Sequence, residues 1–464
     1  MAGSRALSVG QESLWLLHKL APASAAYNDA GAGLFSPAPD VTAMRRSVRL
    51  LVERHDLLRS VFVETDGVPG RQVHGADLVE LDVRDAGGLS DAELGRAVRE
   101  IALEPFALES TGPLRVVLLR RAADAALVVA NHHIATDATS QWLIWKDLLD
   151  AYRSYAVGRE PDLALPGGTY DDYVLHERRL LASPKRARLE QYWRGVCTGA
   201  GPGELPTDRP RPNRQTFSGA TYTRPLAPDL VERIRTAATG LGVTPFAFLL
   251  GTFQALIYRY TAQDDFLLGC PTTTRRTRQT RDVVGYFVNS LVLRARFDRG
   301  STFADAAKAA GGQVMKGSMH VGYPFPLLLQ MLGRAPNSGA PPLFRIAVTM
   351  VSANGFDSTL DVLAAGESGY DSGLRMTPLD VPRLEGQYDL NVEITRTAAS
   401  MTLVFRYNTD LFDPETVERF VNGYTRLLHL AVSNPLATIS RASLVDDAER
   451  ARLLALGTGA VGSV

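Results

Sequence analysis

Residues 131–138 have the sequence NHHIATDA and join two segments of different periodicity. The segment before them, 126–130 (ALVVA), is continuously apolar and predicts a buried strand. The segment after them, 139–152 (TSQWLIWKDLLDAY), has apolar residues at helical spacing and predicts an amphipathic helix. Two adjacent histidines and an aspartate therefore lie in a strand-to-helix turn, here named the histidine turn, and this unit indicates a mixed α/β fold.

The side chains of the histidine turn suit acid–base chemistry. Histidine takes up and returns a proton near neutral pH, and Asp137 at the start of a helix can accept backbone donors or pair with a cation. Adjacent residues of an extended segment point to opposite faces, so only one of His132 and His133 is expected to face a given cleft. The other is expected to be packed in the core.

Metal binding is the weaker interpretation of the same histidines. A zinc site needs three or four protein ligands at suitable spacing. The other histidines are scattered along the chain, and Cys197 and Cys270 are far apart in sequence. These other histidines are His18, His55, His74, His176, His320 and His429.

Length and composition narrow the class of protein. A chain of 464 residues exceeds what one hydrophobic core usually organises, so two lobes of roughly 200 residues each are expected. The chain has 50 basic and 50 acidic residues, and this balance argues against nucleic acid or an electrostatic membrane anchor as a partner. Two cysteines fit a reducing compartment. The N-terminus does not resemble a signal peptide and no apolar run approaches the ~18 residues of a spanning helix, so a cytoplasmic location is expected.

Periodicity predicts alternating helices and strands before a clear break in composition. Residues 198–214 (TGAGPGELPTDRPRPNR) are rich in glycine, proline and charge, which predicts a connection between two lobes. Ahead of it, helices are expected after Ser8 and at 41–53, 91–103, 139–152 and 170–193, and strands at 60–63, 71–73, 114–119 and 126–130.

The second half repeats this mixture of elements. The segment 244–260 is apolar on nearly all sides and predicts a buried central helix. The basic stretch 272–281 (TTTRRTRQTR) predicts either a solvated loop or an arginine that reaches Asp137. Further helices are expected at 228–241, 302–315, 320–332 and 414–431, and strands at 221–224, 266–270, 344–351, 389–394 and 401–407.

Eight stretches, taken in order over nearly the whole chain, resemble the motifs of the condensation domains of non-ribosomal peptide synthetases. The opening stretch resembles the subtype that joins two L-configured residues, and YPFPLL also resembles condensation domains downstream of polyketide modules. The stretches are SVGQESLWLLHKL (8–20), RHDLLRSVF (54–62), NHHIATDA (131–138), LPTDRPRP (205–212), RYTAQDDFLLGCPTTTR (259–275), VGYFVNSLVL (284–293), YPFPLL (323–328) and RYNTDLF (406–412).

The resemblance implies an α/β (α+β) fold of two lobes, a V-shaped pseudo-dimer related to chloramphenicol acetyltransferase with a tunnel between the lobes. We expect an N-terminal lobe at 1–197, a linker at 198–214 and a C-terminal lobe at 215–447. The tail 448–464 resembles the linker that leads into an adenylation domain.

The resemblance also implies a reaction. An upstream donor carrier protein brings an acyl or peptidyl thioester, a downstream acceptor carrier protein presents an aminoacyl thioester, and an amide bond forms between them. The domain itself holds no cofactor, because phosphopantetheine arrives on the carriers.

The match to the family motif assigns roles to five residues. His133 would be catalytic, as a base or as a group that positions the amine, and His132 would be structural. Asp137 would form a salt bridge with Arg275 that holds the turn. Ala138 stands where the family usually has glycine: helical angles would tolerate alanine, whereas a positive φ would strain the turn.

Two alternatives stay open at the level of sequence. The first is a catalytically silent condensation-like module that recruits another protein, with Ala138 as its sign. The second is an acyltransferase of the same fold that forms esters or acts on a free amine.

Overall fold

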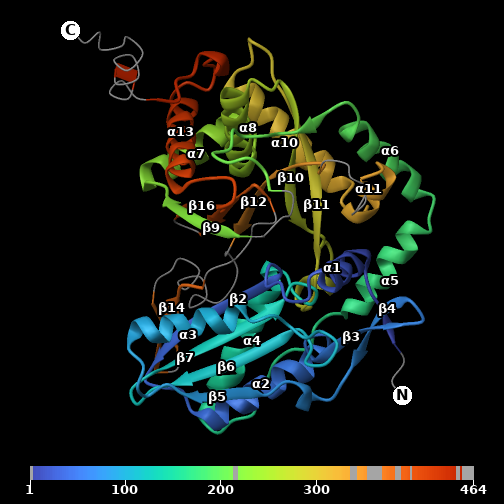
Figure 1. Cartoon of the computed structure of the whole chain (residues 1–464), viewed down its shortest axis with the longest axis vertical. Helices are drawn as coiled ribbons and strands as arrows, with labels where there is room; N and C mark the ends of the chain where they lie inside the picture. The colour runs from blue at the N-terminus through green and yellow to red at the C-terminus, as the bar shows by residue number, and fades with distance from the viewer. Residues whose placement is uncertain are drawn as a thin grey trace.

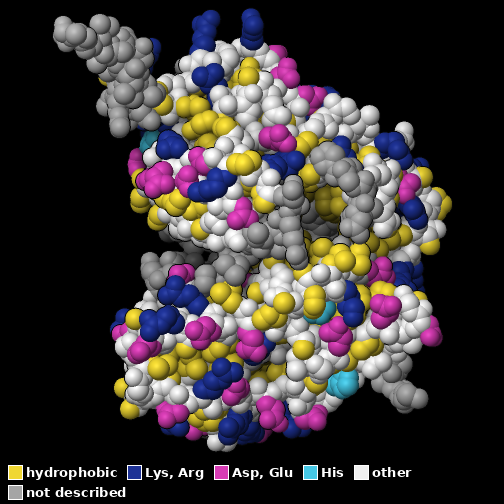
Figure 2. Space-filling view, in the orientation of Figure 1, with side chains coloured by type: hydrophobic (Ala, Val, Ile, Leu, Met, Phe, Trp, Pro, Cys, Tyr) yellow, Lys and Arg dark blue, Asp and Glu magenta, His cyan; other side chains and the backbone are white. Residues whose placement is uncertain are grey.

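The chain folds into two halves, each built on a β-sheet with helices packed against it (Figure 1). The surface is hollowed where the two halves meet (Figure 2). The computed structural model describes residues 4–212, 218–334, 342–352, 368–371, 373–381, 388–397, 400–445 and 450–451.

The sheet of the first half has the strand order β13-β14-β2-β7-β6-β5. Its central strand β7 (Ala125–His132) is buried along its whole length between β2 (Asn28–Ser36) and β6 (Leu114–Arg120), and β5 (Leu81–Asp85) forms one edge. All eight residues of β7 are buried, which explains why its sequence is continuously apolar up to Asn131.

Helices cover both faces of this sheet. Helices α2 (Val41–Arg54) and α4 (Ala138–Ala156) pack on one face, against Val129 and every second residue of β7 before it. Helix α3 (Asp91–Leu103) packs on the other face, against Val128. Strand β7 therefore ends directly beneath the start of α4, which places the histidine turn at one end of the sheet.

A small three-stranded sheet lies beside the first half. It consists of β1 (Arg5–Ala6), β4 (Val68–Val73) and β3 (Ser60–Thr65), in that order. Strands β3 and β4, which contain the predicted strands 60–63 and 71–73, pair antiparallel.

The sheet of the second half has the order β11-β10-β12-β15-β16-β9, and β8 also pairs with β10. Its strands are β8 (Gly201–Pro202), β9 (Gly219–Pro225), β10 (Asp265–Thr273), β11 (Val288–Arg296), β12 (Ile346–Ser352), β15 (Leu390–Arg396) and β16 (Met401–Asn408). Its helices are α7 (Pro228–Leu241), α8 (Pro245–Thr261), α9 (Arg278–Arg281), α10 (Phe303–Met319), α11 (Phe325–Met331) and α13 (Pro414–Ser433).

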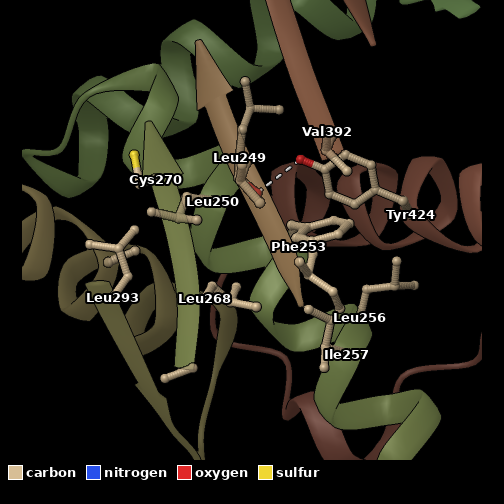
Figure 3. Close-up of a cluster of buried hydrophobic side chains, with 14 of the residues drawn as sticks. Leu249, Leu250, Phe253, Leu256, Ile257, Leu268, Cys270, Leu293, Val392 and Tyr424 are labelled. Atoms are coloured by element: carbon tan, nitrogen blue, oxygen red, sulfur yellow. Dashed lines mark hydrogen bonds between the residues drawn. The ribbon is translucent and has the colours of Figure 1, made fainter. Parts of the chain in front are cut away.

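Helix α8 is the centre of the second core, as its apolar sequence predicts. Phe253 and Ile257 of α8 face Leu268 of β10 in the buried cluster of Figure 3. The hydroxyl of Tyr424, from α13, donates a hydrogen bond to the carbonyl of Leu249 at 2.9 Å, so this buried hydroxyl has a partner.

Three features differ from the sequence-based expectation. The predicted helix 170–193 is two helices, α5 (Tyr170–Leu181) and α6 (Lys185–Cys197), because Pro184 lies between them and has no N–H to continue the hydrogen bonds of α5. Strand β2 was not predicted, since its sequence NDAGAGLFS is rich in residues of weak strand propensity. The expected helix 320–332 is shorter in the structure, because α11 begins only after its N-cap residue Pro324 and ends at Met331.

The second half of the chain also contributes to the first sheet. Strand β14 (Leu374–Leu379) pairs antiparallel with β2, and β13 (Gly369–Asp371) pairs with β14. These residues lie in the range 215–447 that was expected to form the second lobe alone. The predicted lobe boundaries therefore do not describe this exchange of strands.

Some predicted segments lie outside the described residues. These include 213–217 of the expected linker and most of the tail 448–464. In the part of the chain that is described, no single helix is long and apolar enough to cross a membrane; only α7 and α8 taken together pass that test, and they are bent by 98°. Both cysteines are buried, and burial raises the pKa of each thiol to about 12.

Helix α1 (Val9–Leu20) is held at the junction of the halves by α5. Glu177 of α5 accepts a hydrogen bond from the main-chain N of Val9 at 2.8 Å, at the end of α1 where N–H groups lack helical partners. The Glu177 side chain is buried, and this burial, together with nearby Glu12, raises its pKa to about 7.

We predict that Glu177→Gln stabilises the protein at alkaline pH. The raised pKa means that the folded state binds more protons than the unfolded state between pH 4.5 and about 7, so the free energy of unfolding of the wild type falls as pH rises through this window. Glutamine keeps an oxygen for Val9 and loses the charge. Urea unfolding at pH 8 should show a gain of up to ~3 kcal/mol, shrinking toward zero at pH 5.

Glu100→Gln, at an exposed position of α3, is the matched control and should change stability little at either pH. An equal effect of Glu177→Gln at pH 5 and pH 8 would contradict the burial of a charged carboxylate as its cause.

Candidate active site

The first histidine of the turn is enclosed by aromatic rings. His132 is 4% exposed, and its ring centroid lies 5.9 Å from that of His18, 6.3 Å from Tyr27 and 6.2 Å from Phe106. Its Nδ1 accepts a hydrogen bond from the main-chain N of Ile134 at 3.1 Å, so the ring is bound in its neutral form. Burial lowers the pKa of His132 to about 3, which leaves this ring uncharged at neutral pH.

The second histidine has a different environment. The Nδ1 of His133 lies 2.7 Å from the carbonyl oxygen of Thr136, and because a carbonyl only accepts, Nδ1 carries the proton. In the neutral ring the lone pair is therefore on Nε2. The ring is half-buried and meets the ring of Tyr286 edge to face, with centroids 5.6 Å apart. His133 thus has the tautomer that a general base acting through Nε2 requires.

Helix α1 supports the turn from the other side. The Nε2 of Gln11 donates to the carbonyl of Ile134 at 2.8 Å, while its Oε1 accepts from the main-chain N of Ser8 at 3.2 Å. Gln11 is fully buried, and both ends of its carboxamide are in use. Sequence reasoning placed Gln11 in the opening helix but missed its contact with the histidine turn.

Asp137 closes the turn and begins α4. Its Oδ1 accepts from the main-chain N of Ser140 at 2.7 Å, as an N-cap side chain does. Its Oδ2 accepts from the main-chain N of Phe287 at 3.3 Å. Arg275 adds two contacts, from Nη2 to Oδ1 at 3.0 Å and from Nε to Oδ2 at 3.2 Å. Four donors therefore surround this carboxylate, which links the start of α4 to the second half of the chain.

Arg275 is itself fixed by several partners. Its Nη1 donates to the carbonyls of Thr280 at 2.7 Å and Val283 at 2.6 Å, and its Nη2 donates to Ser140 Oγ at 2.6 Å. The guanidinium also lies 4.1 Å from the ring centroid of Phe287. Both side chains of the ion pair are nearly buried, at 6% for Arg275 and 4% for Asp137. The arginine of the basic stretch therefore reaches across from the second half to the first.

Ala138 is the first residue of α4, and its side chain is exposed. Among the described residues, the non-glycine residues with positive φ are Asp66 and Ala262, so Ala138 does not have the left-handed conformation that would require glycine. Alanine is favourable in a helix. Of the two backbone conformations considered from the sequence, the structure has the one that tolerates alanine.

The five residues of the predicted site are thus close together where the two halves are in contact. Their catalytic roles stay predictions. No group of three or more His, Cys, Asp or Glu side chains suited to a metal ion occurs within the described ranges. Two further residues contact the predicted site: Tyr286 packs on His133, and Ser140 accepts a hydrogen bond from Arg275. Ser140 was detectable as the third residue after an N-cap aspartate, whereas nothing in the sequence pointed to the contact of Tyr286 with His133.

Comparison with known sequences gives a consistent result. The sequence model of one family, described as Condensation domain, matches residues 1–454. The chain is 32% identical over 459 residues to one component of the linear gramicidin synthase of Brevibacillus parabrevis, an alignment that covers 97% of this chain and 6% of that protein. The chain therefore spans a small fraction of the curated relatives it matches, which are much longer.

Solved structures show the same fold. A four-domain non-ribosomal peptide synthetase, AB3403, superposes with a TM-score of 0.86 at 19% identity, covering 97% of this chain and 34% of that one. The X-domain in complex with OxyB from teicoplanin biosynthesis superposes with a TM-score of 0.83 at 21% identity, covering 96% of this chain and 97% of that one.

The fold, a two-lobed α/β arrangement related to chloramphenicol acetyltransferase, agrees with these matches, as does the order of the motifs. The chain belongs to the condensation domain family of non-ribosomal peptide synthetases.

Proposed function

We propose that this domain joins a donor acyl or peptidyl thioester to an acceptor aminoacyl thioester through an amide bond. The observation that carries the proposal is the tautomer of His133, whose Nδ1–H is bound to the Thr136 carbonyl and whose Nε2 is left with a lone pair. The ring is held at the junction of the two halves, where two separately delivered substrates can meet.

In the proposed reaction the ring of His133 carries one proton from the attacking nitrogen to the leaving sulfur. The acceptor nitrogen attacks the thioester carbon, an N–C bond forms, and the nitrogen of the tetrahedral intermediate becomes more acidic. His133 Nε2 takes that proton and returns it to the departing sulfur as the C–S bond breaks. The contacts of Gln11 and Asp137 hold the turn, so that Nε2 stays in place during both steps.

The partners follow from the proposed reaction. An upstream donor carrier protein and a downstream acceptor carrier protein would present the two substrates on phosphopantetheine arms, and the domain itself would hold no cofactor. The proposal divides the chain into lobes 1–197 and 215–447 joined by a linker at 198–214, with β13 and β14 of the second range added to the sheet of the first. Residues 448–464 would lead into an adenylation domain in a cytoplasmic synthetase, with neither nucleic acid nor membrane as a partner.

A silent recruitment module is the second candidate. The X-domain shares the fold and is found in a complex with OxyB, so the fold alone does not separate the two functions. Two features of the site favour catalysis: Ala138 has no positive φ, and the neutral ring of His133 has its lone pair on Nε2. An ester-forming or free-amine acyltransferase would use the same base and differ only in the nucleophile.

We predict that His133→Ala reduces condensation by about a hundredfold or more, since general base catalysis contributes at least that factor. Intact-protein mass spectrometry would follow the acceptor carrier after it is mixed with an acyl-loaded donor carrier. His132→Asn is not a suitable control, because it would disturb the buried rings. His74→Ala, at a surface position outside the site, is the matched control and should retain activity.

Product formed equally by wild type and His133→Ala would contradict the proposed base. Absence of product with the wild type, when both carriers are shown to be loaded, would favour recruitment. Offering a free amine or an alcohol in place of the acceptor carrier tests the acyltransferase alternative.

We predict strong coupling between Asp137 and Arg275. Arg275→Met alone should destabilise the domain by about 3–5 kcal/mol, because it leaves a buried carboxylate without its cation. Combining it with Asp137→Asn should restore part of the loss, with an interaction energy of about 1–3 kcal/mol in urea unfolding. The exposed pair Arg49 and Glu53 of α2 is the control, with an expected coupling below about 0.5 kcal/mol. Additive effects at Asp137 and Arg275 would contradict the role of their ion pair.

We predict that Ala138→Gly leaves the site assembled and costs about 0.5–1 kcal/mol of stability, because glycine is the poorer helix former. The turnover of the variant should lie within about threefold of the wild type. A gain in both stability and turnover would show that alanine strains the turn, against the helical geometry at this position.

A further inference from the structure

Two buried glutamines lie near the histidine turn, and only one of them is satisfied. The carboxamide of Gln11 has partners at both ends. Gln141, which is 8% exposed, has no hydrogen-bond partner for Nε2 or for Oε1 among the described residues. The Oδ1 of Asn131, which is fully buried, has none either within the same ranges, although its Nδ2 lies 3.3 Å from the carbonyl of Asp29.

The direction of α4 places these two carboxamides close together. A Cβ added at Gly31 of β2 would lie 2.7 Å from Trp145 Nε1, so the indole of α4 lies directly on this glycine. Past the end of β2, the main-chain N of Asp40 donates to the hydroxyl of Tyr152 at 3.0 Å, and Tyr152 lies seven residues after Trp145 in α4. Helix α4 therefore runs in the same direction as β2.

Gln141 lies one helical turn before Trp145, which places it over the beginning of β2. There Asp29 pairs with Asn131 across the sheet, and Gly31 pairs with Val129 in the same register. Because Val129 and Trp145 share one hydrophobic cluster, this is the face of the sheet that α4 covers. Asn131 has the same parity as Val129 and so points toward Gln141.

Both carboxamides are also close in sequence to the proposed base. Asn131 precedes His133 by two residues, so on an extended backbone the two side chains leave the same face. Gln141 is one residue beyond Ser140, which contacts Arg275. The pair lies between α4 and β2, on the interior side of the turn. This position suits the part of a substrate that is remote from its carrier.

Folded proteins seldom leave buried amide groups without partners. Here two acceptors and an N–H donor group are unpaired among the described residues, within a few positions of the proposed base. These groups are complementary to one further amide. The N–H of that amide would donate to the side-chain oxygen of Asn131 or Gln141, and its carbonyl would accept from Gln141 Nε2. The long glutamine side chain can turn toward an incoming chain without movement of the backbone.

We propose that Gln141, together with Asn131, binds an amide of the donor acyl chain and so selects peptidyl donors over hydrocarbon ones. This inference rests on the proposed function, because it takes the chain presented to His133 as its ligand. Gln141 is a specificity-determining residue in this account, and the acid–base step does not involve it.

The test measures binding, so that it does not depend on turnover. The probes are unreactive pantetheine conjugates in which an amide replaces the thioester. One carries an N-acetylalanyl group, and its isostere carries 2-methylpentanoyl; a longer pair carries N-acetylglycylalanyl and the corresponding hydrocarbon. Calorimetry should give the wild type a roughly tenfold lower Kd for at least one amide-containing probe than for its isostere, the value of one added hydrogen bond.

Gln141→Leu and Gln141→Met should each abolish this preference, and two variants guard against failure of one to fold. The matched control is Gln254→Leu, in which a buried glutamine of α8 loses its partner Gln313, and which should keep the preference. Equal binding of both members of each pair by the wild type would overturn the proposal. So would a preference that survives in both Gln141 variants.

Failure of the proposed function gives a different pattern. A binding preference that depends on Gln141, combined with equal product from wild type and His133→Ala, would refute the base and leave this inference standing.

Discussion

The ion pair between Asp137 and Arg275 is the contact on which the geometry of the site depends. It is nearly buried and joins the start of α4 in the first half to the segment after β10 in the second. A buried ion pair adds little net stability, since desolvation of both charges offsets their attraction. Its effect here is positional: the carboxylate that caps α4 is also the acceptor for Phe287 and Arg275, so the turn has its shape only when the halves are in contact.

The two histidines show how one backbone gives neighbouring residues opposite properties. Alternation at the end of β7 directs His132 toward the rings of His18, Tyr27 and Phe106, where burial lowers its pKa to about 3. His133 leaves the other face, and the turn itself supplies the Thr136 carbonyl that fixes its tautomer. The first ring is therefore packed among other rings, and the second, in its neutral form, has its lone pair on Nε2.

Sequence reasoning found the elements with strong periodicity and the residues with distinctive chemistry. The strand before the histidine turn, the apolar helix α8 and the possible reach of an arginine to Asp137 all followed from local patterns. Strand β2 did not, because its two glycines are explained by side chains distant in sequence: Trp145 packs on Gly31, and Met376 packs on Gly33. The pairing of β14 with β2 joins residues more than 300 positions apart and leaves no local sign. The unpaired amide of Gln141 could not be predicted from the sequence either, because a glutamine in a helix gives the same sequence pattern whether or not its amide has a partner.

The segment from Arg275 to Phe287 makes the main contacts of the second half with the histidine turn and its supports. Arg275 and Phe287 contact Asp137, Gly285 exchanges hydrogen bonds with Ser140, and the carbonyl of Tyr286 accepts from Tyr170 of α5. Tyr170 in turn contacts Ser8, the N-cap of α1, whose neighbour Gln11 holds Ile134. Together these contacts surround His133 with side chains and main-chain groups from both halves. A change in the angle between the halves would therefore displace the support of the ring, so approach of the two lobes and alignment of Nε2 are coupled by the same set of contacts.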